Sequence, residues 1–209
     1  MGRRNKEELI NDILDAAISC HRENNCGSIQ ITDVAARAGV STRTLHRYFA
    51  QKDELVGQAS IRILEHVYKD FAEEYYKLDT QGLNGLDKLM RFMNSQVEFY
   101  KRDSEGAILF VEAMLIAMRR GLLKGFREAN LGREIGDIIT ANVELGIKDG
   151  SIRSDIDPKK VTLLVVTNFN GLMQNATFLM HSDFDKLQED WVFSLFEEYN
   201  QMLRKYIEN

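Results

Sequence analysis

The stretch from Gln30 to Leu55, QITDVAARAGVSTRTLHRYFAQKDEL, places the tightest constraint on the fold of this chain. Thr32 can cap a short helix, because its hydroxyl can accept a backbone N–H that has no partner inside the helix. Gly39 follows where that helix must end and the chain must turn, a position that favours positive φ. Ser41 can cap a second short helix in the same way. The stretch therefore predicts two short helices joined by a tight turn.

Each of these helices has an apolar face, and the second also has a strongly polar one. Val34, Ala35 and Ala38 recur at helical spacing on the first helix, and Leu45 and Phe49 form an i,i+4 pair on the second. The remaining face of the second helix carries donors and positive charge: Thr42, Arg43, Thr44, His46, Arg47 and Tyr48. A helix this short with such a face fits the major groove of DNA. We therefore expect this segment to bind DNA.

Some of the candidate contacts are suited to the phosphate backbone. Lys52 stands at the expected start of a third helix, where backbone N–H groups and the helix dipole also favour an anion. His46 and Tyr48 can donate hydrogen bonds to phosphates, and Thr32 can do so while it caps. We expect these residues to position the protein on the duplex.

The other candidates are suited to base edges: Thr42, Arg43, Thr44 and Arg47. A threonine methyl can rest against thymine, and arginine can hold guanine through two parallel hydrogen bonds. Arg43 is the favoured reader, whereas Arg47 is also suited to a phosphate. These assignments predict sequence-specific binding rather than general attraction to DNA.

The composition predicts an all-α fold. The chain has 209 residues, of which only Pro158 is a proline, and it is 44% hydrophobic and 28% charged. No segment alternates strictly between apolar and polar residues as a half-buried strand does. No uncharged stretch reaches the ~18 residues of a membrane span, and the charged N-terminus lacks the apolar segment of a secretory signal. We expect no membrane association.

The charge is divided unevenly along the chain. The net charge is −5, yet residues 1–52 contain 8 Lys and Arg against 6 Asp and Glu, a balance of +2. Residues 53–209 contain the other 19 and 26, a balance of −7. Attraction to phosphates depends on the local patch rather than on the whole-chain sum. The division predicts a DNA-binding domain over residues 1–52 and an acidic helical domain over residues 53–209.

The last two expected helices, residues 158–181 and 185–208, are apolar over more than one face. Such helices need more than one neighbour. A homodimer formed through these two helices meets that need and suits a two-fold symmetric operator. Burial of both helices at the centre of a monomer is the alternative.

The segment from Ile31 to Leu55 resembles the DNA-binding domain of the TetR family of bacterial transcriptional regulators. The matching residues are Ile31, Thr32, Val34, Ala35, Ala38, Gly39, Val40, Ser41, Thr44, Leu45, Tyr48, Phe49, Lys52 and Leu55. The resemblance implies a three-helix helix-turn-helix domain followed by a helical ligand-binding and dimerisation domain. It also implies a repressor that binds a palindromic operator as a homodimer and is released by a small effector. His46 departs from the family, which usually has tyrosine at this position.

Several methionine and phenylalanine residues of the second domain are suited to an effector pocket, because thioethers and rings adapt to varied apolar ligands. With Glu112, the candidates are Met90, Met93, Phe110, Met114, Phe126, Phe169 and Met173. Glu112 is the polar residue in the run AILFVEAMLIAM. A carboxylate there needs water, a donor or a cation, and the possible partners are Arg91, Arg119 or a cationic lipophilic ligand.

Other classes of function find no support in the sequence. We identify no P-loop, dinucleotide motif, metalloprotease motif or nucleophile elbow, so we expect neither an enzyme nor a cofactor. Cys20, His21 and Cys26 lack the spacing of a metal site, and so few cysteines indicate a reducing cytoplasm. We expect a cytoplasmic, nucleoid-associated protein. The alternative to an effector-controlled regulator is a ligand-independent dimeric DNA-binding protein.

Overall fold

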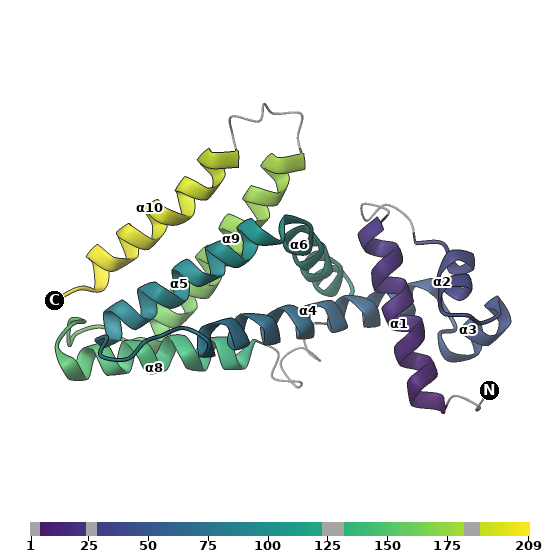
Figure 1. Cartoon of the computed structure of the whole chain (residues 1–209), viewed down its shortest axis with the longest axis horizontal. Coiled ribbons are helices and arrows are strands. Elements are labelled where there is room, and N and C mark those ends of the chain that lie inside the picture. Colours follow the sequence, from purple (N-terminus) through teal and green to yellow (C-terminus); the bar gives the residue numbers. More distant parts are fainter. Residues whose placement is uncertain (1–4, 24–28, 123–131, 182–188) are drawn as a thin grey trace. The chain divides into compact units, whose positions relative to one another are not determined.

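The computed structural model describes residues 5–23, 29–122, 132–181 and 189–209. The regular elements of these residues are helices, together with an isolated antiparallel bridge between Ile152 and Glu208. The helices are α1 (Lys6–Glu23), α2 (Ile31–Arg37), α3 (Thr42–Tyr48), α4 (Lys52–Tyr76), α5 (Gly85–Arg102), α6 (Ser104–Arg119), α8 (Arg133–Asp149), α9 (Pro158–His181) and α10 (Glu189–Ile207) (Figure 1). The predicted all-α fold is confirmed. Among the described helices, none is sufficiently long and apolar to cross a membrane.

Several helix boundaries follow from local capping chemistry that the sequence predicts. α4 begins at Lys52 and α9 at Pro158, where the Asp157 carboxylate accepts the backbone N–H of Lys159 at 2.9 Å. The Asp103 carboxylate accepts the N–H of Gly106 at 2.8 Å and so caps α6. The starts of α4 and α9 agree with the predictions because each depends on residues within one turn.

The predicted cap at Thr32 is wrong. α2 begins one residue earlier than Thr32, with Gln30 at the cap position and without a side-chain cap. Ile29 is buried, with a relative exposure of 5%, and Ile31 packs against the same apolar core. Burial of these flanking isoleucines sets the start of α2, so packing outweighs the capping preference of threonine.

The described chain forms two compact units. The N-terminal unit is drawn from residues 1–67 and 108–129, and the C-terminal unit from residues 68–107 and 130–209. α4 and α6 each contribute residues to both units. The compactness of the two units does not decide which residues bind DNA or an effector. The boundary at residue 52 therefore stays a prediction.

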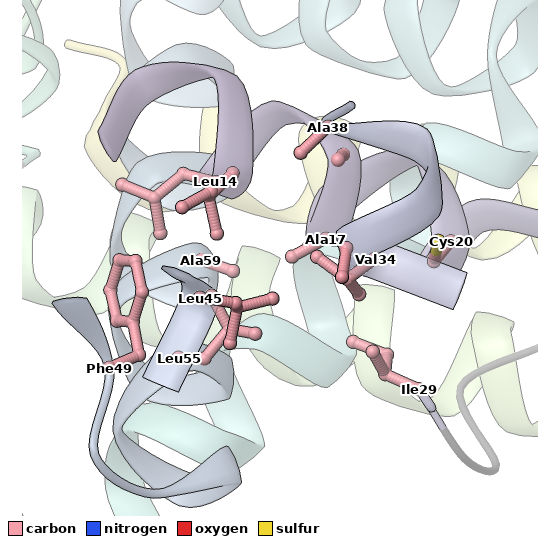
Figure 2. Close-up of a cluster of buried hydrophobic side chains, with 13 residues drawn as sticks. Leu14, Ala17, Cys20, Ile29, Val34, Ala38, Leu45, Phe49, Leu55 and Ala59 are labelled. Atoms are coloured by element: carbon pink, nitrogen blue, oxygen red, sulfur yellow. The ribbon is translucent and has the colours of Figure 1, made fainter. Parts of the chain in front are cut away.

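The N-terminal unit has a core built mainly from residues close together in sequence. α1 packs against α2, and α2 against α3. Their apolar faces meet α4 in one cluster (Figure 2). The buried residues of this cluster are Ile13, Leu14, Ala16, Ala17, Cys20, Ile29, Val34, Ala35, Ala38, Leu45, Phe49, Leu55 and Ala59. Burial of this cluster fixes α3 against the rest of the unit.

The C-terminal unit is a set of packed antiparallel and crossing helices in which α8 contacts α5 and α9, and α10 contacts α5 and α9. α5 and α8 approach closely at Gly85 and Gly146, where a Cβ on Gly85 would clash with the Gly146 backbone. The hydroxyl of Tyr75 and the side-chain amide of Asn142 also join α4 to α8, with the Asn142 Nδ2 donating to the hydroxyl at 3.1 Å. These contacts hold the helices that enclose the cavity described below.

Candidate functional site

The turn between α2 and α3 is held by backbone hydrogen bonds. Gly39 has φ of 64°, its N–H donates to the Ala36 carbonyl at 3.1 Å, and the Val40 N–H donates to the Ala35 carbonyl at 2.9 Å. This pair of bonds is the Schellman arrangement, which requires a residue in the left-handed region. The predicted role of Gly39 is confirmed, and the turn sets the direction in which α3 leaves.

α3 starts at the side-chain cap that the sequence predicts. The Ser41 hydroxyl oxygen accepts the Thr44 backbone N–H at 3.0 Å, and it lies 2.9 Å from the Thr44 hydroxyl. On the opposite side of the helix, Leu45 is fully buried and Phe49 is almost fully buried. The cap and the buried pair fix both the start and the rotation of α3, so its polar face points away from the core.

The predicted DNA contacts differ in exposure. Thr32, Thr42, Arg43, His46, Arg47 and Lys52 are exposed, whereas Thr44 and Tyr48 are half-buried. The Arg47 guanidinium lies 4.9 Å from the centre of the Tyr48 ring and donates to its hydroxyl at 2.9 Å. Stacking of this kind holds Arg47 beside the tyrosine. The helix therefore carries a pre-ordered Arg47–Tyr48 pair beside the exposed Arg43.

The start of α4 is already occupied by acidic side chains of the protein itself. The Glu54 carboxylate accepts the Ala50 N–H at 3.2 Å, and the Arg120 guanidinium donates to the Asp53 carboxylate at 3.0 Å. Since Asp53 is paired with a cation, its charge opposes an anion at the helix start less than an unpaired carboxylate would. Lys52 is exposed at this end of the helix and supplies the positive charge.

The comparisons with known proteins agree with this geometry. A family sequence model described as bacterial regulatory proteins, tetR family, matches residues 13–59, from within α1 to within α4. These residues include the turn, the capped α3 and most of the core beneath it. The chain is a member of the TetR family. TetR-family proteins are DNA-binding regulators rather than enzymes, so this TetR-family protein is a transcriptional regulator.

Similarity to this TetR-family chain extends beyond the matched segment. The HTH-type transcriptional repressor KstR2 of Rhodococcus jostii (strain RHA1) is 24% identical over 148 residues, which cover 70% of this chain and 69% of KstR2. A TetR transcription regulator from Haloarcula marismortui ATCC 43049 superposes with a TM-score of 0.69 at 16% identity, over 97% of this chain and 100% of that one. FadR from Bacillus subtilis, in complex with stearoyl-CoA, gives 0.59 at 15% identity, over 92% and 96%. The structural likenesses establish the fold.

The C-terminal unit of the TetR-family protein contains a small apolar cavity. Two of the predicted effector-site residues, Met93 and Phe169, line it. Met90 and Met173 are buried but are not among its lining residues. Phe110, Glu112 and Met114 lie on the part of α6 that belongs to the N-terminal unit, and Phe126 lies outside the described residues. The structure therefore brings only part of the predicted set together.

Sequence reasoning missed Gln96, which lines this cavity together with the polar residues Tyr68 and Asn170. Gln96 is 3% exposed and interrupts an apolar stripe on α5 that includes Leu89, Met93, Val97 and Tyr100. A polar residue within an otherwise buried stripe is the same signal that singled out Glu112. Applied to α5, that signal identifies Gln96 as well.

The structure gives Glu112 a partner that the sequence analysis did not consider. Its carboxylate oxygen Oε2 lies 3.7 Å from Nε2 of His21 on α1, within the N-terminal unit. His21 is 5% exposed, and burial lowers the pKa of its imidazole. A neutral imidazole makes this a polar contact rather than a full ion pair. Arg91 and Arg119, the partners considered from the sequence, stay predictions.

Proposed function

We propose that this TetR-family regulator is a repressor that binds a palindromic operator as a homodimer and is released by a small lipophilic effector. The observation that carries the proposal is the fixed polar face of α3, with Arg43, His46 and Arg47 exposed opposite the buried Leu45. A short rigid helix with such a face is suited to the major groove. We propose a cytoplasmic location on the nucleoid, where this face meets its DNA.

The proposed contacts divide by chemistry into two groups. Lys52, His46, Tyr48 and Thr32 hold phosphates, while Thr42, Arg43, Thr44 and Arg47 face base edges. The stacking of Arg47 on Tyr48 supports a shared phosphate for that pair, and it leaves Arg43 as the principal reader of sequence. The hydroxyl of Thr44 already lies 2.9 Å from that of Ser41, and its methyl group is suited to a thymine.

The proposed dimer uses the apolar surface of α9 and α10. Leu164, Gly171 and Phe178 recur every seven residues along α9, and a Cβ on Gly171 would meet no other atom within 4 Å. Phe178 and Trp191 are 69% and 74% exposed. Among the side chains of the two helices that the structure describes, the other large exposed apolar residues are Leu163, Leu164, Leu195, Met202 and Tyr206. An apolar surface of this extent supports a protein–protein interface.

The proposed effector response passes along α4. This helix supplies Leu55 and Ala59 to the core beneath α3, and Tyr68 and Phe71 to the wall of the cavity. A ligand that widens the cavity would displace the two aromatic residues and tilt the helix that also supports the DNA-binding core. Half-sites must lie about 34 Å apart for both recognition helices to dock, so a tilt lowers operator affinity. The complex of FadR with stearoyl-CoA supports a lipophilic effector class.

The proposed contacts are tested by paired substitutions on a duplex selected from random sequence by the native protein. Arg43→Ala should weaken binding by roughly 1–3 kcal/mol, mainly at one base pair of each half-site. Lys52→Ala should weaken binding to all sequences and lower the salt slope by about one unit. Fluorescence anisotropy against selected and scrambled duplexes measures both effects. Equal losses on both duplexes for Arg43→Ala would contradict its role as a reader.

A ligand-independent dimeric DNA-binding protein is the second candidate, and the small volume of the cavity favours it. Thermal melting against a library of lipophilic compounds, followed by operator binding with each hit, separates the two candidates. An effector-controlled repressor gives hits that raise the melting temperature and release the operator. The second candidate gives no compound that changes operator affinity.

A further inference from the structure

The cavity of the C-terminal unit lies between α4, α5, α8 and α9. Its volume is about 40 Å³. The lining residues are Tyr68, Phe71, Phe92, Met93, Gln96, Ile135, Ile139, Val165, Val166, Phe169 and Asn170. A ligand site of drug size usually has roughly 300–1,000 Å³, so the walls must move before an effector can enter. Met93 can adapt readily, because its unbranched thioether has several low-energy rotamers.

The lining residues that the structure describes carry no charged group at neutral pH. Tyr68 is the one lining residue with an ionisable side chain, and burial raises the pKa of its phenol to about 12. A ligand carboxylate or ammonium in this cavity would lose its hydration without gaining an opposite charge from the wall. That loss is several times larger than the gain from one additional apolar contact. The wall therefore selects against charged groups.

Tyr68, Gln96 and Asn170 are the polar residues of the described wall, and Gln96 supplies an acceptor without a partner. Gln96 Oε1 is buried and has no hydrogen-bond partner among the described residues. The orientation of the amide follows from Ser95, whose hydroxyl already donates to the Phe92 carbonyl at 2.8 Å and can only accept from Gln96 Nε2 at 3.4 Å. That arrangement directs the nitrogen to Ser95 and leaves the oxygen unpaired. An unpaired buried acceptor is unfavourable, and a donor on a ligand would satisfy it.

We propose that the effector group that enters this cavity is uncharged and largely apolar, and that it carries one hydrogen-bond donor, which Gln96 Oε1 accepts. The inference rests on the proposed function, since it describes the effector of the same regulator. It gives Gln96 a positioning and selecting role on the ligand. It also excludes from this cavity the cationic ligand considered for Glu112, which belongs to the N-terminal unit.

A matched series of naphthalenes tests the preference for a neutral donor. The probes are 2-naphthol, 2-methylnaphthalene, 2-naphthoate and 2-naphthylmethylammonium, titrated at pH 7 into the full-length protein and followed by ligand fluorescence. The neutral probes should bind, and 2-naphthol should bind at least about tenfold more tightly than either ion. An ion that binds as tightly as 2-naphthol would overturn the inference, and so would a series in which no member binds.

Two substitutions then test the acceptor. Gln96→Leu should lower the affinity for 2-naphthol by about fivefold, the size of one hydrogen bond between neutral groups, and should leave 2-methylnaphthalene unaffected. Tyr100→Phe is the matched control: Tyr100 also buries a hydroxyl without a partner and packs against Phe71 and Phe169, but it does not line the cavity. Equal losses of 2-naphthol affinity in both variants would show that Gln96 is not the acceptor.

The folded state of Gln96→Leu is checked independently. Removal of an unpaired buried oxygen in exchange for an apolar group of similar size should leave the melting temperature unchanged or higher. A fall in melting temperature would show that Oε1 is already satisfied, which overturns the inference. A neutral probe that binds through Gln96 but never alters operator affinity would instead contradict the proposed effector release.

Discussion

The two units of this TetR-family regulator use apolar residues in different ways. In the N-terminal unit, α1 to α3 and the start of α4 close one continuous core, and the exposed face of α3 is polar. In the C-terminal unit, α9 and α10 leave Phe178, Trp191 and Met202 more than half exposed, and the packed helices enclose a small cavity.

This difference indicates what each unit needs in order to act. The N-terminal core is complete within one chain, so α3 can hold a fixed polar face for DNA. The C-terminal unit has large apolar side chains exposed on α9 and α10, and Gln96 Oε1 is a buried acceptor without a partner among the described residues. We propose that a second protein chain covers this apolar surface and that a ligand donor satisfies the acceptor. On this proposal, the N-terminal unit binds DNA and the C-terminal unit responds to the effector.

The largest expected effect concerns the exposed apolar surface of α9 and α10. A double variant, Phe178→Glu with Trp191→Glu, should make the protein monomeric and lower operator affinity by more than about a hundredfold, because a monomer engages only one half-site. Sedimentation velocity and operator titration measure the two consequences. Met118→Glu is the control, since Met118 is 52% exposed on α6 and should tolerate the charge. A double variant that remains dimeric would contradict the proposed interface.

The next largest effect concerns the close packing of α5 against α8. Gly85→Ala should lower the free energy of unfolding by about 1–3 kcal/mol, because its Cβ would meet the backbone of α8. Gly136→Ala, within α8, should instead raise it by about 0.5–1 kcal/mol, since a Cβ there meets only a methyl of Thr162 at 3.8 Å. Urea unfolding compares the two variants. A stabilised Gly85→Ala would contradict the close approach of α5 and α8.

A smaller effect tests the local chemistry of the DNA-binding unit. Ser41→Ala should lower the free energy of unfolding by about 1 kcal/mol, because the Thr44 N–H loses its cap. Operator affinity should fall with it as the first turn of α3 frays. Ser154→Ala, in an exposed turn, is the matched control. If both variants melt alike, α3 is held by its core contacts alone.

The smallest effect concerns the buried histidine. Because the folded state keeps the pKa of His21 below its ordinary value, the unfolded state binds a proton that the folded state does not as pH falls below about 6.5. Unfolding free energy should therefore decrease from pH 7.5 to pH 5.5, at less than the ~1.4 kcal/mol per pH unit that one full proton contributes. His21→Gln should flatten this dependence, whereas His66→Gln, exposed on α4, should not. Identical pH profiles for all three proteins would contradict the assignment.

Predictions from sequence succeeded where the cause lies within one turn of helix. Gly39 and Ser41 act on backbone groups a few residues away, and the structure agrees with both predictions. The prediction for Thr32 failed because distant packing of Ile29 and Ile31 sets the start of α2. The methionine and phenylalanine residues predicted to line one pocket lie in different places. Met93 and Phe169 line the cavity, whereas Phe110 belongs to the other unit.

The amino-acid sequence alone determined the family, the helical class and the polar face of α3, because capping, turning and helical periodicity are properties of neighbouring residues. The tertiary structure decided that His21 meets Glu112 and that Gln96 faces an uncharged cavity. His21 and Glu112 lie on helices that are far apart along the chain, and helices from different parts of the chain form the cavity. Their partners depend on how whole helices pack, and no local pattern contains that information.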